Sequence, residues 1–498
     1  MKRTLLKTII FSTLAIGSNP LWAQNAEPIK IEAWVTNPDR SKLFEKQAET
    51  ISFGSRDIRR GGAAIVIDEA QTLQSIDGFG FALTGGSAEL MMKMTPAERS
   101  KLIKEIFGTD GNNIGVSYIR LSIGASDMNS FVFSYDDLPD GETDFALAKF
   151  NLSQDYKDVI PVMKEILTVN PQIKILGSPW SAPKWMKTNN NVKAGSLKPE
   201  CFDVYARYLV KYIQAMKKEG ITIDAITIQN EPLNSNNTPS MQMLPASQTD
   251  FIKTNLGPAF QAANIKTKII LFDHNMDRID YPLTTLRDPE ASKYVDGSGF
   301  HQYGGDLSAM TIMHTAYPNK NLYLTEQMVV EAPGKSTLEA AAQVKRLIIG
   351  GTRNWSRNVI LWNLAADPSN DPHTDNGGCS MCQGAITLDG DKVSRNIAYY
   401  TVAHASKFVR PGSHRIASTN KGDKVVAITE DEEHKGSVRV STIDNAEVLS
   451  NVAFKTPEGK IVLIVANDSN ITNSFRIQYN GQFANIRLAP GAVGTYIW

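Results

Sequence analysis

Between residues 75 and 405, short apolar segments alternate with segments of helical periodicity. The apolar segments are rich in β-branched residues and have the length of buried strands. Eight of them are residues 75–83, 115–123, 174–178, 225–229, 268–272, 298–303, 321–325 and 358–361. The helical segments include residues 97–107 and 202–218. A strand-then-helix unit repeated eight times predicts an α/β fold, a closed (β/α)₈ TIM barrel.

A doubly wound open sheet is the competing interpretation of the same alternation. Such a sheet would need a glycine-rich phosphate loop after its first strand, opening directly into a helix. Gly78-Phe79-Gly80 lacks the third glycine, and no helical segment follows it at once. The barrel is therefore the preferred prediction.

The segments on either side of the barrel have strand patterns without helices. Residues 29–35 alternate polar and apolar side chains, as in a half-exposed antiparallel sheet. Five further strands are predicted at residues 424–428, 437–441, 460–466, 474–479 and 495–498. We expect residues 24–70 and 406–498 to form one attached β-sandwich side domain, with the barrel at 71–405.

The first 23 residues have the composition of a secretory signal peptide. Lys2, Arg3 and Lys7 precede the apolar segment 8–17, and Ala23 offers a small residue for cleavage. This predicts export to the periplasm, the cell surface or the medium. No apolar run has the roughly 18 residues of a membrane span, so no transmembrane segment is expected. The formal charge of zero and the scattered cations argue against a nucleic-acid partner.

Two short motifs raise the question of a metal or redox site. Cys379 and Cys382 form a CxxC, but a zinc site normally needs four ligands and no second CxxC exists. The motif lies in a glycine-rich loop, which leaves a local disulfide or two plain thiols. Asp367, Asp371 and Asp375 do not have EF-hand spacing, so a solvated acidic loop is preferred to a calcium site. We expect no cofactor and no metal.

Two predicted strands lead into glutamates. Glu231 follows the strand at 225–229, and Glu326 follows the strand at 321–325. Working residues of a TIM barrel lie at the C-terminal ends of its strands, so the two carboxylates should face one substrate. A carboxylate pair is the equipment of a glycoside hydrolase. We predict Glu231 as acid/base and Glu326 as nucleophile.

Other side chains at the same strand ends suit a sugar, because aromatic rings stack on its faces and polar groups bind its hydroxyls. Arg120 and Tyr303 are candidates to orient Glu326 and keep it ionised, and Asn230 to bind a sugar 2-hydroxyl. His301 is either a base, a ligand or a neutral hydrogen-bonded histidine. The full set of predicted substrate-binding residues is Arg120, Trp180, Asn230, His301, Tyr303 and Trp362.

The chain resembles glycoside hydrolase family 30, the glucosylceramidase-like family, most densely from about residue 74 to 410. The motifs that carry the resemblance are Asp77-Gly78-Phe79-Gly80, Arg120, Ser178-Pro179-Trp180-Ser181-Ala182-Pro183, Asn230-Glu231-Pro232, His301 with Tyr303, Thr325-Glu326 and Trp362-Asn363-Leu364. The resemblance implies a retaining mechanism with the same two glutamates in the same roles. It also implies a barrel with a β-sandwich built from both termini.

The resemblance leaves the substrate open among β-glucosides. Lysosomal-type members have an acidic residue after the threonine of the first strand, where this chain has Gly85. They commonly have an aromatic residue after the histidine of the sixth strand, where this chain has Gln302. An endo-β-1,6-glucanase is therefore at least as strong an expectation as a glucosylceramidase. A xylan-active enzyme and a non-catalytic carbohydrate-binding protein are the weaker alternatives.

Overall fold

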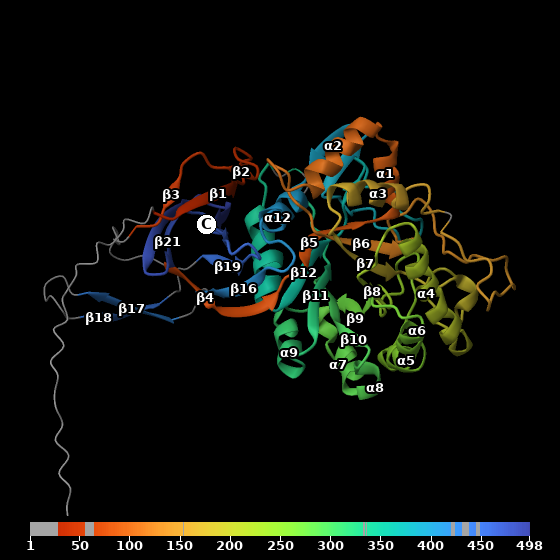
Figure 1. The fold of residues 1–498 in the computed structure, drawn as a ribbon. Helices are drawn as coiled ribbons and strands as arrows, with labels where there is room; N and C mark the ends of the chain where they lie inside the picture. The colour runs from red at the N-terminus through yellow and green to blue at the C-terminus, as the bar shows by residue number, and fades with distance from the viewer. Residues whose placement is uncertain are drawn as a thin grey trace, which may run out of the picture.

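The computed structural model describes residues 28–54, 64–152, 154–331, 334, 336–419, 424–430, 438–444 and 449–498. The expected signal peptide at 1–23 lies outside these ranges. Within them, no helix is both long and apolar enough to cross a lipid bilayer. The ribbon shows a barrel surrounded by helices, with a β-rich side domain next to it (Figure 1).

The eight predicted barrel strands are all present, and they close into a parallel barrel in the order β10-β11-β12-β5-β6-β7-β8-β9. Their bounds are β5 Gly78–Leu83, β6 Tyr118–Ile123, β7 Lys174–Pro179, β8 Ala225–Thr227, β9 Lys268–Asn275, β10 Val295–His301, β11 Asn321–Glu326 and β12 Ser356–Leu361. The prediction of a closed barrel is confirmed, and the doubly wound sheet is excluded.

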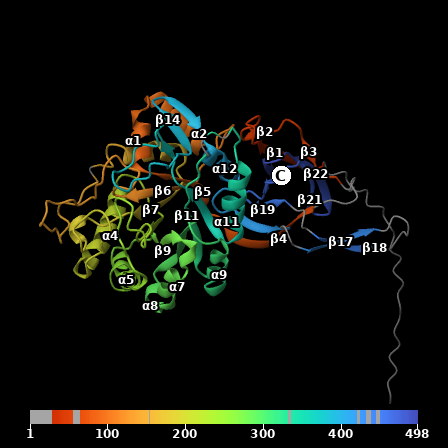
Figure 2. The same cartoon turned by 180° about the vertical axis from the view of Figure 1, so that it is seen from behind.

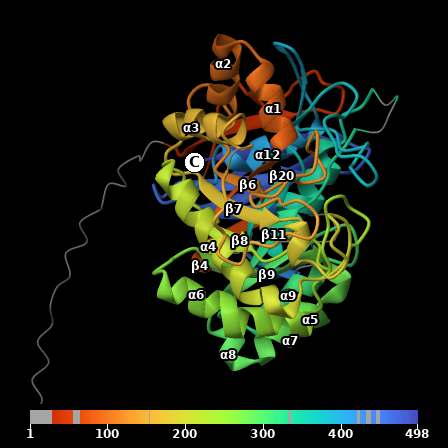
Figure 3. The same cartoon turned by 90° about the vertical axis from the view of Figure 1, so that its right-hand side faces the viewer.

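Helices cover the outer face of the barrel, as Figure 3 shows from the side. The longest, α4 (Phe202–Lys218), has the predicted bounds and buries one apolar face. The others are α1 Gly85–Lys93, α2 Pro96–Phe107, α3 Val159–Val169, α5 Pro245–Phe251, α6 Gly257–Ala262, α7 Asp280–Arg287, α8 Pro289–Ser292, α9 Ser308–Ala316, α10 Ala340–Gln343, α11 Gly350–Arg353 and α12 Ile397–Ser406. π-helical turns at Ile252–Leu256 and Val344–Ile349 join α5 to α6 and α10 to α11.

The interior of the barrel is packed with side chains from most of its strands. One buried apolar cluster is made of Tyr118, Leu176, Ala225, Ile270, Tyr323 and Ile360. These residues come from β6, β7, β8, β9, β11 and β12, so the cluster crosses the barrel. The barrel is therefore a packed core, and its chemistry is confined to its rim.

The side domain is built from both ends of the chain, as predicted. Strand β1 (Lys30–Thr36) pairs antiparallel with β23 (Val493–Ile497), so the N-terminal segment completes the C-terminal sheet. The sheet order is β2-β1-β23-β20-β19-β16-β4-β21-β22, with β3 pairing with β1. The remaining bounds are β2 Glu45–Lys46, β3 Ile51–Ser52, β4 Ala64–Ser75, β16 His414–Ser418, β19 Ser450–Lys455, β20 Ile461–Ala466, β21 Asn473–Tyr479 and β22 Gln482–Leu488.

Two details differ from the expected strands. Strand β4 continues to Ser75 within the side-domain sheet, so the first barrel strand begins at Gly78 and not at residue 75. Strands β17 (Lys424–Glu430) and β18 (Val438–Asp444) pair only with each other among the described strands. This hairpin projects beside the sandwich (Figure 2), and the sandwich sheet is completed instead by β16, β19 and β22, which the pattern did not predict.

Candidate active site

The two predicted catalytic glutamates come from different backbone settings at the same rim. Glu326 is the last residue of β11. Strand β8 ends early, at Thr227, so Glu231 lies in the loop that follows. Its backbone has a φ of +42°, in the left-handed region that non-glycine residues rarely adopt. Its N–H donates to the Asp273 carbonyl at 3.0 Å, which holds this conformation in place.

The two carboxylates approach each other closely. An oxygen of Glu231, an oxygen of Glu326 and a ring nitrogen of His301 all lie within 4.8 Å of one another. The two glutamates are buried, with exposed fractions of 7% and 6%. A separation of about 5–5.5 Å between carboxyl groups is typical of retaining glycosidases, and inverting enzymes keep them further apart.

Glu326 is held by a cation and a phenol. Arg120 Nη1 donates to Glu326 Oε2 at 2.5 Å, and Tyr303 Oη donates to Glu326 Oε1 at 3.0 Å. Burial raises the pKa of Glu326, while the positive charges of His301 and Arg120 act to lower it. The two predicted orienting residues therefore contact the carboxylate that they were expected to hold.

Glu231 is held by a histidine and two amides. His301 Nδ1 lies 3.1 Å from Glu231 Oε1. Asn234 Nδ2 and Asn237 Nδ2 donate to Glu231 Oε2 at 2.7 and 3.3 Å. Although burial opposes the charged form, hydrogen bonding and charge from His301 lower the pKa of Glu231 to about 2.

A fully buried ionic cluster lies beneath the two glutamates. Arg120 Nη2 donates to Asp273 Oδ2 and to Asn230 Oδ1, both at 2.8 Å. His301 Nε2 lies 3.1 Å from Asp273 Oδ1, so the imidazole bridges Asp273 and Glu231. Burial opposes a charged imidazole, but the surrounding carboxylates, Glu326 foremost, raise the pKa of His301 to about 10. The imidazole thus lies between two carboxylates, a setting that favours its protonated form over the neutral histidine that was one of the expectations.

The two predicted tryptophans lie together on this cluster. Trp180 and Trp362 have ring centroids 5.2 Å apart, and the Arg120 guanidinium lies 4.8 Å from the Trp180 centroid. Both rings are buried, at 2% and 3% exposure. They pack with Ala82, Met128 and Cys382 as well as against Arg120. Tyr303, by contrast, is 43% exposed as a residue.

Four further residues at the site, Asp127, Asn234, Asn237 and Asp273, were given no role by the sequence analysis. Asp273 lies at the centre of the ionic cluster. Asp127 is buried, and its Oδ1 has no hydrogen-bond partner in the described part of the chain. Burial and the charges of Glu326 and Glu231 raise the pKa of Asp127 well above its usual range. Its position in the loop that follows β6 was the only signal available.

The two positions that differ from lysosomal-type members both make close local contacts. Gly85 opens helix α1, and a β-carbon on it would lie 1.9 Å from Asn129 Nδ2. The Asn129 amide therefore fills the space of a side chain at position 85. Gln302 is partly buried and accepts from Arg346 Nη1 at 3.5 Å.

Glu231, His301 and Glu326 are also the one set of His, Cys, Asp and Glu side chains, among the described residues, whose ligand atoms gather closely enough for a metal ion. These atoms are already engaged with each other, and the Arg120 guanidinium lies 2.5 Å from Glu326. A guanidinium in that position repels a cation, so the arrangement fits an acid–base cluster better than a metal centre.

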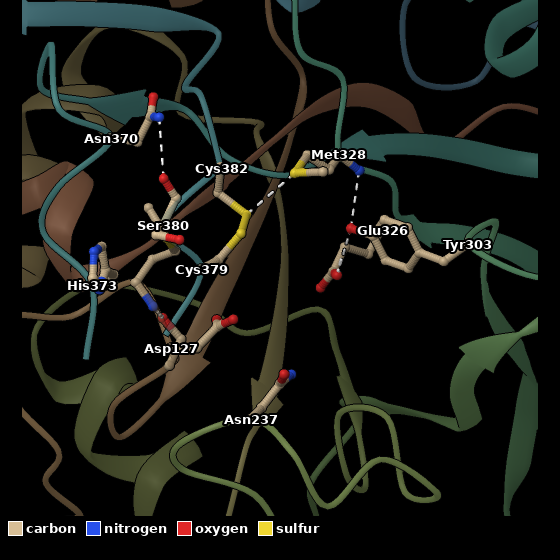
Figure 4. The surroundings of a disulfide bond; sticks show 12 residues. Asp127, Asn237, Tyr303, Glu326, Met328, Asn370, His373, Cys379, Ser380 and Cys382 are labelled. Carbon is tan, nitrogen blue, oxygen red and sulfur yellow. Dashed lines mark hydrogen bonds between the residues drawn. A yellow bond between two sulfur atoms is a disulfide. The ribbon is translucent and has the colours of Figure 1, made fainter. Parts of the chain in front are cut away.

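The CxxC and the acidic residues lie in one loop beside the glutamates, between β13 (Ala365–Ala366) and β14 (Ile386–Asp389). Cys379 and Cys382 form a disulfide, which decides between the two open interpretations of the CxxC. Figure 4 shows the disulfide and Glu326 with Met328 between them. Asp367 accepts hydrogen bonds from the backbone of Ser369 and Asp371 and so closes a turn.

Comparison with known proteins agrees with a barrel that carries two glutamates and an attached β-sandwich. Residues 76–409 match the glycosyl hydrolase family 30 TIM-barrel domain, and residues 436–496 match the family 30 beta sandwich domain. An endo-1,6-beta-D-glucanase of Neurospora crassa is 34% identical over 403 residues, which are 78% of this chain and 82% of that protein. The lysosomal acid glucosylceramidase of Mus musculus is 26% identical over 520 residues, covering 99% and 95%.

Solved structures include the same kind of enzyme. A structure titled as an endo-beta1,6-glucanase is 31% identical, with a TM-score of 0.82, and the match covers 94% of this chain and 99% of that one. The family model spans well over half of the chain and includes both glutamates, Arg120, His301 and both tryptophans. The chain belongs to glycosyl hydrolase family 30 and is a glycoside hydrolase.

Proposed function

We propose that this enzyme is a retaining endo-β-1,6-glucanase. The observation that carries the mechanism is the pair of buried carboxylates with oxygens within 4.8 Å of each other. The observation that carries the substrate is the 34% identity to endo-1,6-beta-D-glucanases over more than two thirds of the chain. The expected signal peptide supports export of the enzyme to a compartment where a polymeric glucan is accessible.

In the first step, Glu326 attacks the anomeric carbon while a proton passes from Glu231 to the leaving oxygen. The Arg120 and Tyr303 contacts orient the attacking carboxylate and favour its ionised form. In the free site the Glu231–His301 pair holds one proton, which lies on the imidazole. The proton that Glu231 delivers is supplied along the 3.1 Å contact with His301 Nδ1.

The second step reverses this proton path. Glu231 removes a proton from a water molecule, the water attacks the glycosyl ester on Glu326, and the proton returns to His301. In the ester intermediate Glu326 has lost its negative charge and His301 its positive charge. The net charge of the buried cluster is therefore the same in the free enzyme and in the intermediate, so neither step adds charge to the buried site.

Several polar groups of the site are available to a sugar. Asp127 Oδ1 and the indole Nε1 of Trp180 are buried without hydrogen-bond partners among the described residues. Asn230 accepts from Arg120 through its oxygen, so its NH₂ group remains as a donor. Buried polar groups without partners are costly unless a ligand satisfies them. This supports a hydroxyl-rich ligand at the two glutamates.

A glucosylceramidase is the second candidate. The 26% identity to the lysosomal enzyme over 99% of this chain supports it. Against it stand Gly85, whose side-chain space is filled by Asn129, and Gln302 in place of an aromatic residue. A xylan-active enzyme has the weaker support of sharing this fold with xylanases at 20% identity or less.

The test is hydrolysis of a panel that contains β-1,6-glucan, β-glucosylceramide and xylan by the mature protein. We expect internal cleavage of β-1,6-glucan, seen as early release of oligosaccharides of several lengths. Glu326→Gln is the matched inactive control. Release of glucose alone from the chain end, or faster turnover of glucosylceramide, would contradict the endo-glucanase proposal.

A further inference from the structure

The loop that carries the disulfide contacts both sides of the active site. It runs from residue 367 to 385, between β13 and β14. Cys382 is 3% exposed and packs in a cluster with Trp180 and Trp362, the tryptophans that lie on Arg120. The disulfide therefore lies against the aromatic part of the site. Figure 4 shows the disulfide together with Met328 and Glu326.

On one side the disulfide leads to Glu326 in three contacts. Cys382 Sγ lies 3.4 Å from the sulfur of Met328. The backbone N–H of Met328 donates to Tyr303 Oη at 3.0 Å. That hydroxyl in turn donates to Glu326 Oε1 at 3.0 Å. Since Met328 supplies the donor that fixes the Tyr303 hydroxyl, a shift of Met328 would move the hydrogen bond to Glu326.

On the other side the loop holds the segment that supports Glu231. Thr238 Oγ1 donates to the Asn376 carbonyl at 2.6 Å, and the Thr238 N–H donates to the Gly377 carbonyl at 3.3 Å. Thr238 directly follows Asn237, which donates to Glu231. The Thr374 N–H also donates to the Asp127 carbonyl at 2.9 Å. The same loop thus contacts the residues next to the hydrogen-bond partners of both glutamates.

We propose that the Cys379–Cys382 disulfide is a positioning element for catalysis, which fixes the 367–385 loop so that Met328 holds the Tyr303–Glu326 hydrogen bond. This inference rests on the proposed role of Glu326 as nucleophile. It predicts that the disulfide affects the reactivity of Glu326 through Tyr303, beyond any contribution to folding stability.

The experiment removes the disulfide with the double variant Cys379→Ser/Cys382→Ser and compares it with Cys201→Ser. Cys201 is a buried free thiol at the start of α4, so it controls for the chemical change alone. We expect kcat/KM to fall about tenfold in the double variant, because small displacements of reacting groups are costly. The Tyr303 hydrogen bond favours the ionised carboxylate. Its loss should therefore raise the apparent pKa of the acid limb of the kcat/KM profile by about half a pH unit.

Tyr303→Phe identifies the route of the effect. Tyr303→Phe removes the hydroxyl, so disulfide removal in that background should produce no further shift of the acid limb. Reduction of the folded wild type with dithiothreitol provides a second measurement, which does not depend on the double variant folding. Fully additive effects of the disulfide and Tyr303 would contradict the proposed route. So would a loss of activity that only follows the folded fraction, with an unchanged pH profile.

A measurement without substrate separates this inference from the proposed function. The pKa of the Glu326 carboxyl is followed by ¹³C NMR in protein labelled at glutamate, with Glu326→Gln for assignment. Disulfide removal should raise this pKa by about half a pH unit. An unchanged pKa would overturn the inference even if the wild type hydrolyses β-1,6-glucan. Inactivity of the wild type on every β-glucoside would instead contradict the proposed function, and the NMR titration would still decide the inference.

Discussion

Glu231 and Glu326 are the same residue type within a few ångströms of each other, but their surroundings differ. Glu326 ends a strand and is held by an arginine and a phenol. Glu231 lies in a loop with a left-handed backbone and is held by a histidine and two amides. The fixed cation favours a carboxylate that stays ionised, while the titratable imidazole favours one that exchanges a proton. We propose that this difference between the two surroundings, and not the residue type, gives the two glutamates their different roles.

The largest effect is expected from Glu326→Gln. The amide keeps the shape of the side chain but cannot attack the anomeric carbon. We expect kcat to fall by more than about 10⁴-fold, as measured with β-1,6-glucan oligosaccharides. Glu98→Gln, at a partly exposed position on α2, is the matched control and should keep wild-type activity. Comparable activity in the two variants would show that Glu326 is not the nucleophile.

Glu231→Gln should have a smaller effect that depends on the leaving group. General acid–base catalysis contributes about 10²–10⁴-fold, and a leaving group that needs no proton makes less use of it. We expect the loss with a nitrophenyl β-glucoside to be much smaller for the glycosylation step than the loss with a glucan. Equal losses on both substrates in single-turnover measurements would argue against Glu231 as the general acid. The two glutamates would then not have the different roles proposed for them.

His301→Gln tests the charged bridge by its pH dependence. The pKa of His301 is raised to about 10, so its contribution to stability is complete below the unfolded-state pKa of about 6.5 and is lost as the pH rises toward 10. The difference in thermal unfolding temperature between wild type and variant should therefore be largest at pH 6 and shrink toward pH 10. A difference that is constant with pH would mean that the imidazole is not charged in the folded enzyme.

The smallest effect is expected from Asn234→Ala. The lost hydrogen bond to Glu231 Oε2, 2.7 Å long, is one of several that this carboxylate accepts. A net worth of about 1 kcal/mol per hydrogen bond corresponds to a decrease of about fivefold in kcat/KM. Asn236→Ala, two residues along the same loop and exposed, should leave kcat/KM unchanged. If both variants have wild-type values, the amides do not contribute to the surroundings of Glu231.

The parts of this molecule that the sequence predicts are those set by periodicity. Each barrel strand is a short apolar run, and polar side chains in or just after its C-terminal part lie near the rim, which is how Glu326, Arg120 and Tyr303 were found. Loop geometry has no such signal. Asn234 and Asn237 reach Glu231 only because the chain turns sharply after Pro232, and the role of Asp273 depends on three partners that are distant in sequence.

In the side domain, too, periodicity predicts the strands but not the contacts between distant parts of the chain. Its alternating strands were predicted, but sheet membership depends on pairing partners far along the chain, such as β1 with β23. The hairpin β17–β18 has a good strand pattern and yet pairs outside the sandwich sheet. The disulfide likewise was one of two open choices until the loop geometry brought Cys379 and Cys382 together.

The most direct test of the two-carboxylate mechanism is the configuration of the first product. Hydrolysis of a β-1,6-linked gluco-oligosaccharide is followed by ¹H NMR from the first minutes, before the sugar anomers interconvert. Double displacement by Glu326 and Glu231 predicts that the β-anomer forms first and the α-anomer appears only by later interconversion. Initial formation of the α-anomer would show a single displacement and contradict the assignment of Glu326 as nucleophile.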